Sequence, residues 1–193
     1  MTPTPAEIVT ATLAASARLH RQAQKSSVTA TVAAAEAMIT ALRAGGKILV
    51  CGNGGSASDA QHFAAELVGR FERERPALAS IALTTDTSIL TAVANDYAYA
   101  KIFARQVEAI GREGDVLMGI STSGGSHNVL EAFATAKRCG LTTVALTGRD
   151  GGVVGASAAI HINVPSESTA RAQEVHRTLL HAICELVERE SYA

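Results

Sequence analysis

His62 and Glu66 stand four residues apart, just behind a glycine-rich turn that follows an apolar run. In a helix this spacing places both side chains on one face. Near the C-terminus, Gln173, Arg177 and His181 also recur at intervals of four. Imidazole and carboxylate groups on two helices could bind a divalent metal such as zinc, or could transfer protons as a general acid and base. The spacing leaves both kinds of chemistry open.

The same side chains serve both hypotheses. As a metal site, the candidate ligands are His62, Glu66, Gln173 and His181, although glutamine is an unusual ligand and a histidine and glutamate four apart often form only a surface hydrogen bond. As a proton-transfer site, a carboxylate and an imidazole on opposite sides of a sugar could interconvert an aldose and a ketose. Glu66 and His181 are the candidate catalytic residues for that reaction.

Two loops that join apolar runs to predicted helices are suited to bind an anion. Glycines let backbone N–H groups approach a ligand, a helix N-terminus adds partial positive charge, and hydroxyls donate hydrogen bonds. A phosphate monoester fits these donors, and an ordinary helix N-cap is the alternative role for serine and threonine. The candidate residues are Gly52, Asn53, Gly54, Gly55 and Ser56 in the first loop, and Ser121, Thr122, Ser123, Gly124, Gly125 and Ser126 in the second.

Other phosphate and nucleophile motifs do not fit. The first loop loosely matches a dinucleotide fingerprint, but the second strand has no acidic residue at its end to bind a ribose, since Asp86 comes too late. The chain has neither the Gly-Lys-Ser/Thr of a Walker A loop nor a Gly-x-Ser-x-Gly elbow. We therefore assign the hydroxyl-rich loop to phosphate.

Short, continuously apolar runs alternate with helical stretches, which is typical of strands buried on both faces of a parallel sheet. The predicted fold class is α/β, a three-layer sandwich whose five-stranded, mostly parallel sheet is flanked by helices. Strands are expected at 47–51, 80–84, 115–121, 142–147 and 159–165. Helices are expected at 56–71, 87–110 with a break near Asn95, 126–139 and 168–191, with a turn at 148–152.

The alanine-rich segment 1–45 precedes this pattern. Residues 5–43 contain no glycine or internal proline, so we expect one long helix or two. Small residues on its faces would allow close packing against a second copy of the chain, or the segment could only cover its own sheet. We expect residues 46–193 to form the α/β domain, and the whole chain to form a single structural domain.

Composition narrows the possible partners. Seventeen basic and 18 acidic residues give a net charge of -1 over 193 residues, so nothing favours nucleic acid. No apolar run is long enough to span a membrane and the N-terminus does not resemble a secretory signal, so we expect a cytoplasmic protein. The three cysteines form no pair pattern and are expected to be buried thiols, although Cys51, beside the first loop, could be reactive.

Several segments together resemble the phosphoheptose isomerases, a branch of the sugar isomerase (SIS) domain family. In order and spacing they are CGNGGSASDAQHFAAELVGRF, RPALASIALTTDTSILTAVANDY, FARQVEAIGREGDVLMGISTSGGS, ALTGRDGG and QEVHRTLLH. The resemblance covers about residues 46–190, and residues 1–45 share only helical character. Gly125 and His127 depart from the family pattern, in which an asparagine and a proline are more frequent.

The resemblance implies conversion of sedoheptulose 7-phosphate to D-glycero-D-manno-heptose 7-phosphate through an enediol, in a cytoplasmic homotetramer with zinc. It assigns Glu66 and His181 as base and acid, and His62, Glu66, Gln173 and His181 as metal ligands. It places Asn53, Gly54, Gly55, Asn95 and Asp96 in the substrate site and Ser121, Thr122, Ser123 and Ser126 at the phosphate. Two alternatives stay open: a non-catalytic SIS module that binds a sugar phosphate or the replication initiator, and isomerisation of a different phosphosugar.

Overall fold

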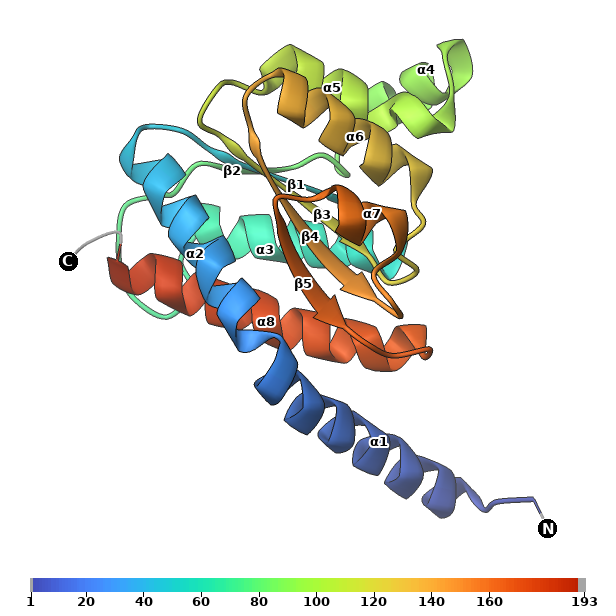
Figure 1. The fold of residues 1–193 in the computed structure, drawn as a ribbon. Helices are drawn as coiled ribbons and strands as arrows, with labels where there is room; N and C mark the ends of the chain where they lie inside the picture. Colours follow the sequence, from blue (N-terminus) through green and yellow to red (C-terminus); the bar gives the residue numbers. More distant parts are fainter. Residues whose placement is uncertain (1, 191–193) are drawn as a thin grey trace.

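Five parallel strands form the central sheet of the computed structural model, which describes residues 2–190. Their spatial order is β2-β1-β3-β4-β5 (Figure 1). Each predicted strand is present, and the sheet is parallel throughout the described chain rather than mostly so. The strands are β1 (Ile48–Gly52), β2 (Ser80–Ala82), β3 (Val116–Ser121), β4 (Thr142–Gly148) and β5 (Ile160–Val164).

Helices cover both faces of the sheet, so the predicted three-layer sandwich is confirmed (Figure 1). Alternate strand residues face opposite layers, as the period of a β-strand requires. Val50 and Met118 pack toward α2, α3 and α8, whereas Leu49 and Leu117 pack toward α5 and α6. The helices are α1 (Pro5–Ser26), α2 (Val28–Arg43), α3 (Gly55–Val68), α4 (Thr87–Asp96), η1 (Tyr99–Lys101), α5 (Ile102–Ile110), α6 (His127–Arg138), α7 (Gly152–Ser157) and α8 (Thr169–Glu190).

The strand order places a crevice between β1 and β3. From β1 the chain continues through α3 to β2 on one side, and from β3 it continues through α6 to β4 on the other side. In an open parallel sheet, ligands bind at the carboxyl ends of the strands where the winding direction reverses. Both candidate anion loops therefore lie at the ligand-binding position of this fold.

Three details refine the predicted elements. The N-terminal segment is two helices, divided at the buried Ser27, whose hydroxyl donates to the carbonyl of Asn163 at 2.9 Å. The break expected near Asn95 is present, because α4 ends at Asp96. Helix α7 was not predicted, because its GVVGAS sequence carries two glycines of low helix propensity. Among the described residues, no helix is both long and apolar enough to cross a membrane.

Candidate active site

Helices α3 and α8 lie side by side on one face of the sheet and bring three predicted site residues together. His62 Nε2 lies 2.8 Å from His181 Nε2 and 3.3 Å from Glu66 Oε1. The two imidazole ring centroids are 5.1 Å apart, and the ring of Phe71 lies 5.5 Å from that of His181. The carboxylate and both imidazoles thus converge on one point, although His181 is more than 110 residues from the other two.

The composition of this cluster fits a metal ion. One donor atom from each of His62, Glu66 and His181 lies within 4.8 Å of the other two, close enough for one ion to contact all three. Two imidazole nitrogens and a carboxylate oxygen are a ligand set that zinc accepts. The side chains of His62 and Glu66 are 35% and 23% exposed, so a small ligand can reach the cluster from solvent.

Gln173, the fourth predicted ligand, lies at the other end of the same helix pair. Its amide packs against Gly55, where an added Cβ would lie 2.4 Å from Gln173 Nε2. Gln173 precedes His181 by eight residues, about 12 Å along a helix axis. The structure therefore places Gln173 beside the first loop, apart from the three clustered residues, and its role as a ligand stays a prediction.

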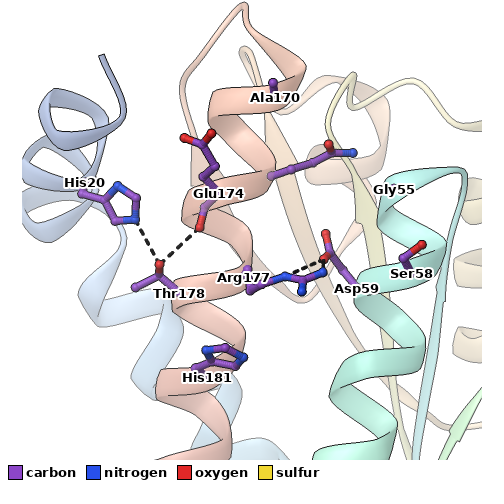
Figure 2. Close-up of a pocket in the computed structure, with 10 residues that line it drawn as sticks. His20, Gly55, Ser58, Asp59, Ala170, Glu174, Arg177, Thr178 and His181 are labelled. Atoms are coloured by element: carbon purple, nitrogen blue, oxygen red, sulfur yellow. Dashed lines mark hydrogen bonds and ion pairs between the residues drawn. The ribbon is translucent and has the colours of Figure 1, made fainter. Parts of the chain in front are cut away.

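An ion pair separates these two ends. Arg177 Nη2 donates to Asp59 Oδ1 at 2.6 Å, and Figure 2 shows the guanidinium reaching from α8 across to α3. Asp59 is 3% exposed, whereas nearly half of the Arg177 side chain is accessible to solvent. These residues line a cavity of about 570 Å³ together with Gly55, Gln173 and His181. The cavity is large enough for a phosphorylated sugar.

Three serine hydroxyls of the second loop lie close together. Ser121 Oγ lies 2.8 Å from Ser126 Oγ and 3.5 Å from Ser123 Oγ, so three hydroxyls cluster between β3 and α6. Gly124 has a positive φ of 68°, and an added Cβ would lie 2.4 Å from the carbonyl oxygen of Gly151. This position therefore requires glycine. Thr122 occupies the loop between Ser121 and Ser123 and is partly buried.

We expect Ser121→Ala and Ser123→Ala each to raise KM for a phosphorylated substrate about fivefold, with a smaller change in kcat. The estimate takes about 1 kcal/mol for each lost hydrogen bond. Steady-state kinetics on the purified variants would test it. Ser26→Ala, which removes an exposed hydroxyl bonded to Gln22 on α1, is the control. Unchanged KM in both loop variants would contradict the assignment.

The residues of the first loop differ in their exposure to solvent. Gly54 has a φ of 55° and is exposed with Gly55, whereas Ser56 is buried and its N–H donates to the carbonyl of Asn53 at 3.0 Å. Asn53, the first residue after β1, is partly buried. Asn95 and Asp96, at the end of α4, are exposed and bonded to each other, Asn95 Nδ2 to Asp96 Oδ1 at 2.8 Å. Their part in substrate binding stays a prediction.

Two other reactive residue types near the site belong to the core. Cys51 is fully buried, and burial raises the pKa of its thiol to about 12, so the alternative of a reactive Cys51 is not supported. His176 is also fully buried, and its Nε2 lies 2.9 Å from the carbonyl oxygen of Thr147. Burial lowers the pKa of His176, so the imidazole is neutral at pH 7 and donates this hydrogen bond.

A buried ion pair behind the cluster was not foreseen. Arg75 Nε donates to Glu188 Oε1 at 3.0 Å, and both side chains are at most 3% exposed. Arg75 also donates to the carbonyl of Glu66 at 2.7 Å and to that of Leu67 at 2.9 Å, so it caps the last turn of α3. The sequence held one signal: Glu188 follows His181 by seven residues and therefore shares its helix face.

Comparison with known proteins identifies the family of this chain. The SIS domain model matches residues 13–148. A phosphoheptose isomerase of Neisseria gonorrhoeae (strain NCCP11945) is 54% identical over 185 residues, which is 94% of each chain. That of Halorhodospira halophila is 57% identical over 161 residues, covering 82% of this chain and 81% of the relative.

Solved structures give the same result. Phosphoheptose isomerase GmhA from Neisseria gonorrhoeae superposes with a TM-score of 0.91 at 50% identity, covering 96% of this chain and all of the other. The enzyme from Francisella tularensis superposes with a TM-score of 0.93 at 39% identity, covering 97% of this chain and all of the other. The chain belongs to the SIS domain family and, within it, to the phosphoheptose isomerases.

Proposed function

We propose that the protein isomerises sedoheptulose 7-phosphate to D-glycero-D-manno-heptose 7-phosphate, the first step of nucleotide-activated heptose synthesis. The observation that carries this proposal is the convergence of Glu66 and His181, from separate helices, at a point where His181 also lines a cavity of sugar-phosphate size. The relatives named phosphoheptose isomerase support the choice of substrate.

In the proposed reaction, the loops bind the substrate and residues of α3 and α8 transfer the protons. The hydroxyls of Ser121, Thr122, Ser123 and Ser126 and nearby backbone N–H groups hold the phosphate. Glu66 removes the proton from the carbon next to the carbonyl, which gives an enediol. His181 protonates and deprotonates the two neighbouring oxygens, and Glu66 returns its proton to the adjacent carbon. The first loop, Asn95, Asp96 and Gln173 orient the sugar hydroxyls.

We propose that His62, Glu66 and His181, with Gln173 as a predicted fourth ligand, hold one zinc ion per subunit. The convergence of three donors supports this assignment. A bound divalent ion would polarise the substrate oxygens and so stabilise negative charge in the enediol. Because a coordinated carboxylate is a poor base, the ligand role and the base role of Glu66 would compete.

Zinc binding has a measurable consequence. The purified protein is expected to carry about one zinc ion per chain. A metal chelator is expected to lower turnover, because it removes the zinc ion that the ligand atoms on α3 and α8 would share. Elemental analysis and assays before and after chelation would measure both. His62→Ala should lose the metal, whereas His20→Ala should keep it, because His20 is bonded instead to Ser16 and Thr178. Full zinc content in His62→Ala would contradict the assignment.

We further propose that the enzyme is a cytoplasmic homotetramer with active sites near subunit interfaces. Helix α1 extends away from the sheet, and within it Leu19 and Ala23 are the residues buried in the described chain (Figure 1). Ile8, Val9 and Leu13 on the same helix are more than half exposed. An apolar face of this kind is suited to packing against another copy of the chain.

One experiment tests the reaction directly. The purified protein would be incubated with sedoheptulose 7-phosphate, and NMR would follow formation of the aldose phosphate, with a pentulose and a hexulose phosphate in parallel. We expect turnover of the heptulose phosphate alone. Binding without turnover would support a non-catalytic SIS module instead, and turnover of another ketose phosphate would change the substrate.

A further inference from the structure

The side-chain amide of Asn53 is held on two sides. Asn53 Nδ2 donates to Asn128 Oδ1 at 2.9 Å, and Asn128 Nδ2 donates back to Asn53 Oδ1 at 2.8 Å. The hydroxyl of Tyr99 donates to the same Asn53 oxygen at 3.0 Å. An amide oxygen has two lone pairs, so both are used and the orientation of the amide is fixed. One N–H of Asn53 remains for a ligand.

These three residues come from three separate segments. Asn53 lies in the loop between β1 and α3, Asn128 is 3% exposed in the first turn of α6, and Tyr99 lies in η1. The first two segments border the crevice between β1 and β3. The third begins three residues after Asp96, with which α4 ends. The hydrogen bonds therefore connect the segments that carry the predicted substrate-binding residues.

Polar contacts connect the η1 segment to its neighbours, in addition to the buried Ile102 and Phe103 that directly follow it. Helix α4, which precedes it, has no buried residue within the described chain, and Tyr99 itself is 61% exposed. Besides the Tyr99 bond, Lys101 Nζ forms an ion pair with Glu131 on α6 at 2.8 Å. A phenol this exposed gains little from burial, so its well-formed hydrogen bond to Asn53 is its most specific contact.

We propose that Tyr99 and Asn128 are positioning residues for substrate binding, acting through the amide of Asn53. The inference rests on the proposed function, in which Asn53 contacts the sugar. A side chain already held in its bound orientation loses less conformational freedom when the ligand binds. Because this benefit applies equally to the ground state and the transition state, its loss raises KM and leaves kcat nearly unchanged.

Tyr99→Phe tests the hydroxyl alone. We expect KM for sedoheptulose 7-phosphate to rise about threefold to tenfold, with kcat and the melting temperature close to wild type. Tyr97→Phe is the matched control, because Tyr97 is 64% exposed and its ring contacts Arg105, 5.1 Å from the guanidinium carbon to the ring centroid. Asn128→Ala is expected to raise KM in the same way.

A double-mutant cycle separates positioning from direct contact. If Tyr99 acts through Asn53, adding Tyr99→Phe to Asn53→Ala should leave KM unchanged. An equal rise in KM in both backgrounds, or no rise in the wild-type background, would overturn the proposal. Absence of turnover by the wild-type protein would instead refute the proposed function. In that case the same cycle would be measured as the Kd of sedoheptulose 7-phosphate by calorimetry, with the same two outcomes.

Discussion

Glu66→Gln is expected to lower kcat for sedoheptulose 7-phosphate by about 10²- to 10⁴-fold while the substrate still binds. Glutamine has the shape of glutamate but cannot accept the proton from carbon. The loop proposed to bind phosphate, which contains Ser121 and Ser126, is separate from α3 and is untouched by the change. Steady-state kinetics combined with calorimetric binding of the substrate would measure the two effects separately.

A metal role for Glu66 has to be distinguished from its role as a base. The zinc content of Glu66→Gln makes the distinction, because loss of turnover with zinc retained assigns the defect to proton transfer. Glu74→Gln is the control, since Glu74 is 94% exposed and pairs loosely with Arg70 at 3.9 Å. Turnover near wild type in Glu66→Gln would remove Glu66 from the base role. His181→Gln should behave as Glu66→Gln does, because the two residues serve the same proton-transfer sequence.

Residues adjacent in the sequence made the loops and the sheet predictable. Gly54 and Gly124 mark turns with positive φ, and the apolar runs before them mark strands buried on both faces. The spacing of His62 and Glu66 correctly placed both on one face of α3. The convergence of His181 on them depends on how α8 packs against α3. The residue types on the two helices suggested it as one possibility, and the resemblance assigned it.

The sequence pattern did not predict the contacts between residues that are distant in the chain. A glutamine side chain can pack against a loop residue such as Gly55 or can bind a metal ion. The spacing of Gln173 on its helix therefore did not show which of these positions it occupies. The hydrogen bond from Tyr99 to Asn53 joins residues 46 positions apart. The pairing of Arg75 with Glu188 spans 113 positions, and both are of residue types that are usually exposed. Such pairs become visible only when the packing of the helices is known.

Glu188 holds the segment after α3 against α8. Its carboxylate accepts hydrogen bonds from the N–H groups of Phe71, Glu72 and Arg73 at 2.9 to 3.1 Å, in addition to the pair with Arg75. Arg75 in turn caps the turn of α3 that contains Glu66. This carboxylate therefore stabilises the fold and also the position of the proposed catalytic base.

Glu188→Gln is expected to lower the free energy of unfolding by about 3 kcal/mol, because it leaves the Arg75 charge buried without a counter-ion and turns an amide group toward backbone N–H groups. Denaturant unfolding at pH 7 would measure the loss. Glu185→Gln, one turn earlier on α8, is the control. Its pair with Arg189 is more than half exposed, so a change within about 0.5 kcal/mol is expected.

The pH dependence of this loss follows from the carboxylate. Burial alone raises the pKa of Glu188, but the hydrogen bonds from Glu72, Phe71, Arg73 and Arg75 outweigh it and hold the pKa below its ordinary value of 4.5. A lowered pKa means that the stabilisation is fully present above pH 4.5 and is lost as the pH falls through the folded-state pKa. The difference in unfolding free energy between wild type and Glu188→Gln should therefore stay constant from pH 7 to about pH 5 and narrow below pH 4.5. A difference that stays constant into the acid range would show that the carboxylate charge does not cause the stabilisation.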